Sequence, residues 1–327
     1  MQIHVSFDYE LFFGGASGTV QKCMIEPTQQ LLEIAEKHGV SFVFFVDAGY
    51  LCRLKDYLHI ESCRADYLAV SKQLNAIINK GHELALHIHP HWEDSYFTDG
   101  QWQINTSRYK LADFGDEEIQ QLMNRYHQTL QEITGKSCRS YRAGGWCIQP
   151  FAPIGKALAQ NGIFTDSTVY YKGYHASEAH RYDFRKAPNR AEWHFEEDPC
   201  LPVPGGKFLE IPVTPDRIPP FFYWKLYLKM RTNPSLYRPV GDGQWLADRK
   251  RVYRHFYHAT DHFACADGFF ASRLWPVLKR SEKDEKARMM ILSHPKSMAP
   301  YSFKALDEFI TFAKARGHRF DRISSSE

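Results

Sequence analysis

The sequence predicts an α/β fold in which helices alternate with the strands of a parallel sheet. Apolar, strand-like segments recur along the chain, and most are followed by a helical pattern. One of them, residues 40–47, is almost continuously apolar, which is typical of a strand that helices cover on both faces. Alternating β and α units imply right-handed crossovers around a parallel sheet, either open or closed as a barrel.

The composition is that of an ordinary globular protein with a large core. The chain has 327 residues, of which 43% are hydrophobic and 24% charged, and we expect one α/β domain over residues 1–327. Lysine and arginine exceed aspartate and glutamate by 41 − 38 = 3, an excess too small to indicate a nucleic-acid partner. The aromatic content of 15% suits stacking against sugar rings, although most aromatic residues fill cores.

The first expected strand, residues 2–7, alternates in polarity and then breaks into Asp8-Tyr9-Glu10. Residues two apart in an extended chain face the same side, so Asp8 and Glu10 are expected to address one cavity. A helix over residues 29–37 follows, with Gly39 as its stop signal.

The buried strand at 40–47 leads to a helix from about residue 66 to 80, and Gly81 opens a strand that carries a cluster of histidines. A helix then begins at the acidic residues 116–118 and ends near Gly135. The same alternation continues through further segments, which are strands at 140–142, 163–166, 208–213 and 289–294 and helices at 152–161 and 302–316.

Two stretches interrupt this alternation, at about residues 170–206 and 214–262. Insertions of this kind usually form the walls of a site. The second contains the aromatic and basic run 219–231, for which a packed helix, a glycan-binding surface and a membrane-surface segment all stay open.

No leader-like segment and no run of eighteen apolar residues is found, so we expect a cytoplasmic protein without a membrane span. The seven cysteines are odd in number and scattered without a Cys-x-x-Cys pair, which favours reduced, buried thiols.

Residues 82–91 hold four of the sixteen histidines and predict a metal site. Neutral imidazole is the commonest protein ligand for zinc-like metals, and His82, His87, His89 and His91 lie close enough in sequence to share one ion. Strand geometry lets positions 87, 89 and 91 share a face, but Pro90 should bend the chain, so spacing alone does not choose among them.

The other polar candidates also follow strand-like segments. Arg142 ends the segment at 140, Asp166 ends the one at 163, and His294 ends the one at 289. In α/β folds of this kind the carboxyl ends of the strands form the active-site face, so these residues are expected on one rim with Asp8 and Glu10.

In this order and spacing the residues resemble the polysaccharide deacetylase superfamily, whose members include carbohydrate esterase family 4. The resemblance implies a distorted (β/α)7-type barrel and covers nearly the whole chain outside the insertions. Ser6-Phe7-Asp8-Tyr9-Glu10 looks like an Asp-x-Glu variant of the first motif. By similarity Asp8 is the catalytic base and Glu10 a metal ligand, although the two could exchange roles.

The remaining roles come from the same resemblance. Gly81-His82-Glu83 with His87 and His91 matches the second motif, which makes His87 and His91 the metal ligands. Arg142 then orients the base, and Asp166 positions His294, the general acid within Leu292-Ser293-His294-Pro295. Ser167 stands where the family often has a tryptophan.

The resemblance implies a metal-dependent hydrolase that removes an N-acetyl or other short acyl group from an amino sugar in a saccharide or its precursor. Zinc fits two histidines and a carboxylate, and cobalt, nickel or iron are alternatives. Two other functions stay open, an amidase or deformylase acting on a small non-sugar amide and a degenerate protein that binds carbohydrate without cleaving it. The expected partner is the sugar substrate, and peripheral membrane contact through residues 219–231 stays open.

Overall fold

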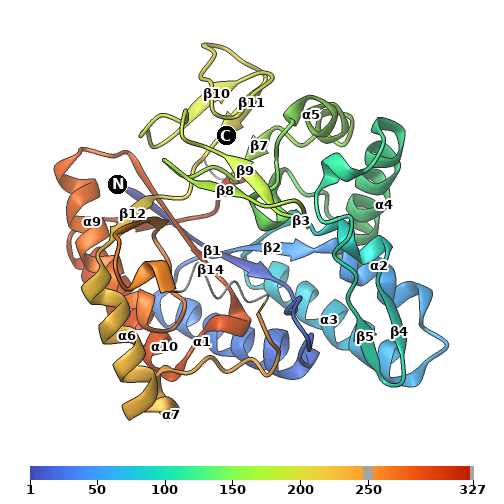
Figure 1. Cartoon of the computed structure of the whole chain (residues 1–327), viewed down its shortest axis with the longest axis horizontal. Helices are drawn as coiled ribbons and strands as arrows, with labels where there is room; N and C mark the ends of the chain where they lie inside the picture. Colours follow the sequence, from blue (N-terminus) through green and yellow to red (C-terminus); the bar gives the residue numbers. More distant parts are fainter. Residues whose placement is uncertain (246–252, 325–327) are drawn as a thin grey trace. The chain divides into compact units, whose positions relative to one another are not determined.

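The computed structural model describes residues 1–245 and 253–324 (Figure 1). The chain divides into two compact units. The first unit consists of Met1–Phe42 and Val213–Asp321, and the second of Val43–Pro212 and Arg322–Glu327. The prediction of one domain over the whole chain stays a prediction.

The first unit is built on β1 (Gln2–Tyr9), which pairs in parallel with β14 (Arg288–Ser293) and, at its start, with β15 (Arg319–Phe320). Every residue of β1 after Gln2 is buried, so the alternating polarity of this strand does not give it a solvent-exposed face. Helices in this unit include α1 (Glu26–His38), α9 (Leu274–Lys283) and α10 (Pro300–Ala315). Helix α1 ends at Gly39, which adopts the left-handed conformation that favours glycine.

The second unit contains a run of five parallel strands in the order β2-β3-β6-β7-β11, with β10 antiparallel at the edge (Figure 1). These strands are β2 (Val43–Asp47), β3 (Glu83–Ile88), β6 (Ser140–Ala143), β7 (Thr165–Asp166), β11 (Phe208–Glu210) and β10 (Trp193–Phe195). The connecting helices are α2 (Ala48–Asp56), α3 (Glu61–Asn79), α4 (Asp116–Thr134) and α5 (Phe151–Gln160).

Most expected elements are present within a few residues of their predicted bounds, and α2 and α9 are additional. The first inserted stretch contains a small hairpin, and the second contains α6 (Pro220–Thr232). The hairpin consists of β8 (Tyr174–Ala176) and β9 (Arg181–Asp183). The second insertion also contains β12 (Pro215–Ile218), α7 (Pro234–Tyr237) and β13 (Thr260–Phe263). Residues 246–252 of the second insertion lie outside the described residues.

All seven cysteines are buried as free thiols, as expected. Across residues 1–245 and 253–324, no helix combines the length and the hydropathy needed to span a membrane.

Candidate active site

The first unit brings together two of the predicted acids and the predicted proton donor. Asp8 lies in β1, Glu10 follows it, and His294 follows β14, whose Ser293 is in register with Phe7. The Nε2 atom of His294 lies 3.8 Å from Oδ2 of Asp8 and 3.9 Å from Oε1 of Glu10. Both carboxylates are buried, so the parallel pairing of two strands creates a compact, water-poor acid–imidazole group.

The other ring nitrogen of His294 is held by Asp267, a residue that the sequence did not single out. Nδ1 donates to Oδ2 of Asp267 at 2.8 Å, while the backbone N–H of His294 and the hydroxyl of Ser293 donate to Oδ1. The resemblance gave this positioning role to Asp166. That assignment stays a prediction, and the Nδ1 partner of His294 within the first unit is Asp267.

A sequence signal for Asp267 exists, although it is weak. Cys265 forms an isolated parallel bridge with Leu292, so the short apolar run 263–266 lies beside β14 and is ended by Asp267-Gly268. An acid that ends a strand-like run resembles the pattern at Asp8 and Asp166. The run is too short to stand out as a strand.

The charges around His294 favour its protonated form. Burial acts to lower the pKa of His294, but the charge and hydrogen bond of Asp267, with Asp8 and Glu10, outweigh it and raise that pKa above the usual value. Burial likewise acts to raise the pKa of Asp267, and the charge of His294 with three donated hydrogen bonds lowers it overall. An imidazolium held by an ionised carboxylate is suited to donating a proton.

Glu10 has a lysine partner that sequence reasoning also missed. The Nζ atom of Lys296 lies 2.8 Å from Oε1 of Glu10, and both side chains are buried. The same ammonium lies 4.9 Å from the ring centroids of Phe12, Phe13 and Trp245. A cation at this distance favours the ionised carboxylate, which is the form that binds metals.

The second unit gathers three of the clustered histidines at the end of β3. His87, His89 and His91 are all buried. The ring of His89 lies between the other two, with centroid distances of 4.8 Å to His87 and 5.5 Å to His91. Pro90 begins a short 3-10 turn, so His91 is carried on a helical turn rather than on the strand.

The structure favours His87 and His89 as a chelating pair. Nδ1 of His87 donates to the backbone carbonyl of Arg142 at 2.8 Å, so in the neutral ring Nε2 is the nitrogen with a lone pair. Ligand nitrogens of His87 and His89 lie within 4.8 Å of one another, whereas the ring of His91 stacks on Tyr109 at 5.8 Å. The resemblance favours His91 instead of His89, and that assignment stays a prediction.

Gly144 is needed for this cluster. A Cβ atom at position 144 would lie 2.4 Å from the carbonyl oxygen of Ile88 and 2.7 Å from Nδ1 of His89, far inside contact distance. Any larger residue at this position would displace the His89 ring.

Arg142 and Asp166 occupy neighbouring strands of the second unit. Arg142 is buried, donates to the carbonyl and the hydroxyl of Ser167, and packs its guanidinium over the Phe45 ring at 3.8 Å. Its predicted role toward Asp8 stays a prediction. Asp166 accepts hydrogen bonds from the hydroxyl and backbone N–H of Thr168.

Asp166 also shares a hydrogen bond with Glu210, its partner in the β7–β11 register. Burial, followed by the charge of Asp166, raises the pKa of Glu210 well above its usual value. Burial of the two neighbouring carboxyl groups therefore favours a proton shared between them.

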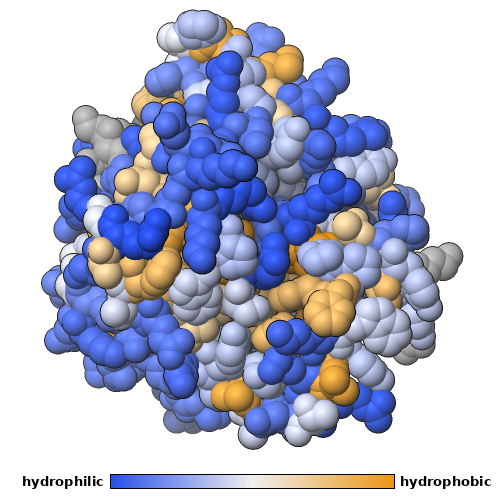
Figure 2. Space-filling model, turned by 90° about the vertical axis from the view of Figure 1, so that its left-hand side faces the viewer, coloured by the Kyte–Doolittle hydropathy of each residue, from blue (hydrophilic) through white to orange (hydrophobic). Residues whose placement is uncertain are grey.

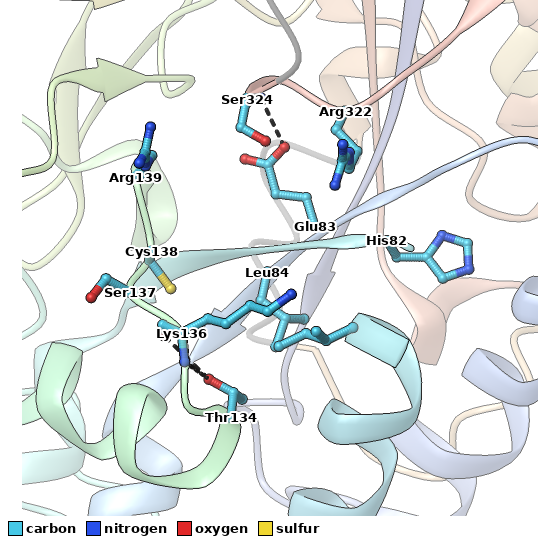
Figure 3. Close-up of a pocket in the computed structure, with 11 residues that line it drawn as sticks. His82, Glu83, Leu84, Thr134, Lys136, Ser137, Cys138, Arg139, Arg322 and Ser324 are labelled. Carbon is cyan, nitrogen blue, oxygen red and sulfur yellow. Dashed lines mark hydrogen bonds between the residues drawn. The ribbon is translucent and has the colours of Figure 1, made fainter. Parts of the chain in front are cut away.

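His82 lies at the opposite end of β3 from the other histidines, five residues before His87, a separation of roughly 16 Å along a strand. It lines a separate pocket of about 240 Å³ with Glu83, Cys138 and Ser324. In that pocket the Glu83 carboxylate points to the backbone N–H of Ser324, while the His82 ring points away from it (Figure 3). His82 therefore lies apart from the other three clustered histidines.

Residues 17–148 match the family described as polysaccharide deacetylase. No curated protein sequence matches the chain. The match includes the histidine cluster and Arg142, but it begins after Asp8 and Glu10 and ends before Asp166 and His294.

Several solved structures are similar to this chain. A polysaccharide deacetylase from Mycobacterium smegmatis is 17% identical, covers 99% of this chain and 87% of its own, and has a TM-score of 0.55. A polysaccharide deacetylase from Bacillus cereus is 13% identical with a TM-score of 0.44, and covers 98% and 90% of the two chains. A family 4 carbohydrate esterase pseudoenzyme from Bacillus anthracis is 12% identical with a TM-score of 0.43, and covers 99% and 64%.

The resemblance recognised in the sequence is therefore confirmed over residues 17–148, and the likeness to the mycobacterial structure shows the expected α/β fold.

Proposed function

We propose that this protein, whose residues 17–148 match the polysaccharide deacetylase family, is a metal-dependent hydrolase that removes an acetyl or other short acyl group from an amino sugar. One observation carries the proposal. Asp8, Glu10 and His294 converge within the first unit, with His294 supported from behind by Asp267. Acyl transfer to water needs a base, an acid and a group that stabilises the oxyanion, and this cluster provides the first two.

In this proposal Asp8 accepts the proton of the attacking water. His294, kept cationic by Asp267, donates a proton to the departing amine, so the sugar leaves as a neutral amine and the acyl group as a carboxylic acid. Asp267 holds the His294 ring so that Nε2 faces the substrate side. Arg142 and Asp166 remain proposed members of the site.

The donor set fits a zinc-like ion. We propose one carboxylate, Glu10, with two imidazoles, His87 and His89, and His91 as the alternative second histidine. Two observations support the fit, the fixed His87 tautomer and the ionised state that Lys296 favours in Glu10. When bound, a divalent ion of this kind lowers the pKa of water and polarises an acyl oxygen. Zinc fits best, and cobalt, nickel or iron are alternatives.

The test is release of acid from a panel of substrates by the metal-loaded protein. The panel contains acetylated chitooligosaccharides, acetylated nucleotide sugars and small formamides, and the released acetate or formate is quantified. We expect acetate from at least one acetylated sugar, and its loss in Asp8→Asn and His294→Ala, which should retain bound metal.

Two results would contradict the proposal. Turnover of the formamides alone would assign the site to a small non-sugar amide. Binding of saccharides without acid release, at full metal content, would make the protein a carbohydrate-binding relative.

The predicted cytoplasmic location stays a prediction, which cell fractionation tests.

A further inference from the structure

Helix α6 exposes large apolar side chains along its outer side. Phe221, Trp224 and Leu228 are spaced at i, i+3 and i+7 and are 75%, 51% and 59% exposed. This spacing places them on one stripe of the helix. Figure 2 faces the side of the molecule that carries α6, and orange and pale side chains gather across the lower right of that view.

The opposite side of α6 already provides its packing. Phe222 and Tyr223 are buried in a cluster with Phe269, and Leu226 and Met230 pack against the same cluster. The exposed stripe therefore contributes little to the core. An apolar face that packing does not require indicates a binding surface.

The apolar surface extends beyond α6. The Trp224 ring lies 4.7 Å from that of Phe256, and its Nε1 donates to the Phe256 carbonyl. Tyr253 and Tyr257, on either side of Phe256 in sequence, are 69% and 72% exposed. Tryptophan and tyrosine are the residues enriched where a protein meets the headgroup region of a membrane.

This segment is also strongly basic. From residue 217 to 241 the sequence contains five basic and no acidic residues, namely Arg217, Lys225, Lys229, Arg231 and Arg238. Lys225 and Arg231 are exposed beside the apolar stripe, and Arg231 donates to the hydroxyl of Tyr227. Few acidic residues neighbour this segment. Asp261 lies opposite Arg217, and Asp216 forms ion pairs with Arg273 and Arg280.

We propose that the outer face of α6, formed by Phe221, Trp224, Tyr227, Leu228, Lys225 and Arg231, docks on an anionic lipid bilayer. The apolar stripe enters the headgroup boundary while the cations contact lipid phosphates. A second copy of the chain fits this face less well, because two surfaces of the same positive charge repel each other. The proposal goes beyond the deacetylase chemistry and does not depend on it.

Docking would bring the catalytic unit to substrates held at a membrane. The inner residues Leu226 and Met230 line an apolar pocket of about 290 Å³ that also includes Asp267, the residue that holds His294. The bilayer-facing helix and the proposed proton donor are thus connected through one pocket within the first unit.

Co-sedimentation of the full chain with vesicles tests the proposal. We expect binding to vesicles of equal parts phosphatidylglycerol and phosphatidylcholine, weaker binding at high salt, and little binding to pure phosphatidylcholine. The triple variant Phe221→Ser, Trp224→Ser, Leu228→Ser should lose about a hundredfold in partitioning, as should Lys225→Glu with Arg231→Glu.

Matched controls are available on other helices. Leu68→Ser removes an apolar side chain that is 61% exposed on α3, and Lys304→Glu reverses an exposed charge on α10. Both should bind like the unaltered protein, and circular dichroism should show that every variant is folded. Equal binding to neutral vesicles, absence of binding to anionic vesicles, or self-association that the α6 variants abolish would overturn the proposal.

Discussion

At the scale of single residues, His294 is the centre of the proposed chemistry. Its two ring nitrogens face different carboxylates, with Asp267 at Nδ1 and Asp8 with Glu10 near Nε2. The contact of Nδ1 with Asp267 thus fixes the tautomer and the charge of His294, while Nε2 faces the reacting groups. On this proposal Asp267 affects turnover through His294 rather than through the substrate.

Replacing Asp267 by asparagine tests this positioning role. Asp267→Asn removes the negative charge that raises the pKa of His294, so we expect kcat to fall roughly a hundredfold while metal content is unchanged. The pKa of His294, followed by NMR, should fall as well. Asp166→Asn serves as the comparison, and a normal His294 pKa in Asp267→Asn with a lowered one in Asp166→Asn would restore the role to Asp166.

Metal content of single alanine variants identifies the histidine ligands. We expect His87→Ala and His89→Ala to lose most of the bound metal and His91→Ala to retain it, because His87 and His89 offer the closely spaced nitrogens. Elemental analysis after dialysis measures this directly. Metal that is retained in His89→Ala but lost in His91→Ala would support the ligand pair implied by the resemblance, His87 and His91. Full metal occupancy in His87→Ala would contradict both ligand pairs.

Residues that end long strands were predictable, and their partners were not. Asp8, His87, Arg142 and His294 could be singled out because each follows or ends an apolar run, and their roles stay predictions. Asp267 and Lys296 could not, because their functions arise from contacts over 27 and 286 residues of sequence separation. The apolar run that precedes Asp267 is only a few residues long, so it could not be recognised as a strand.

At the scale of elements, strands β1 and β14 position the acid–imidazole group. Their parallel pairing runs from Gln2 opposite Arg288 to Phe7 opposite Ser293, which places the residues after both strands at one edge. At the other end of β1, buried His4 donates from Nδ1 to the carbonyl of Asp321 beside β15. The same strand therefore carries the site and a buried titratable group.

His4 should make the fold sensitive to acid. Burial lowers its pKa to about 4 from 6.5, so the unfolded chain binds a proton that the folded chain does not at pH values between these two. Stability should therefore fall as pH drops through this range, by up to about 3 kcal/mol from this group.

Denaturant unfolding at several pH values measures the effect of His4. His4→Asn retains a donor near the Nδ1 position and removes the titration, so the loss of stability between pH 6.5 and 4 should become shallower. His59→Asn, at an exposed position, is the matched control. An unchanged pH dependence in His4→Asn would show that other groups account for it.

Helix α6 shows where sequence patterns stop being informative. Its apolar residues surround the helix, so periodicity could not separate a packed helix from a surface-binding one. The structure shows that both descriptions hold, with Phe222 and Tyr223 packed and Phe221 and Trp224 exposed. Helix α2 escaped prediction because it begins directly after the buried strand β2, without a loop to mark its start.

At the scale of the whole molecule, each compact unit carries its own group of the proposed site residues. The first supplies Asp8, Glu10 and His294, and the second supplies the histidine cluster and Arg142. The alternation of strands and helices made the fold class predictable, whereas the elements within the two insertions follow no regular sequence pattern. Substrate choice is expected to depend on those insertions.

A crystal structure of the zinc-loaded protein with acetate bound would show the metal ligands and the proton donor together. We expect one ion held by Glu10, His87 and a second histidine of the cluster, with acetate within hydrogen-bond distance of His294 and beside Asp8. An ion bound by other residues, or acetate remote from His294 at full zinc occupancy, would contradict this expectation.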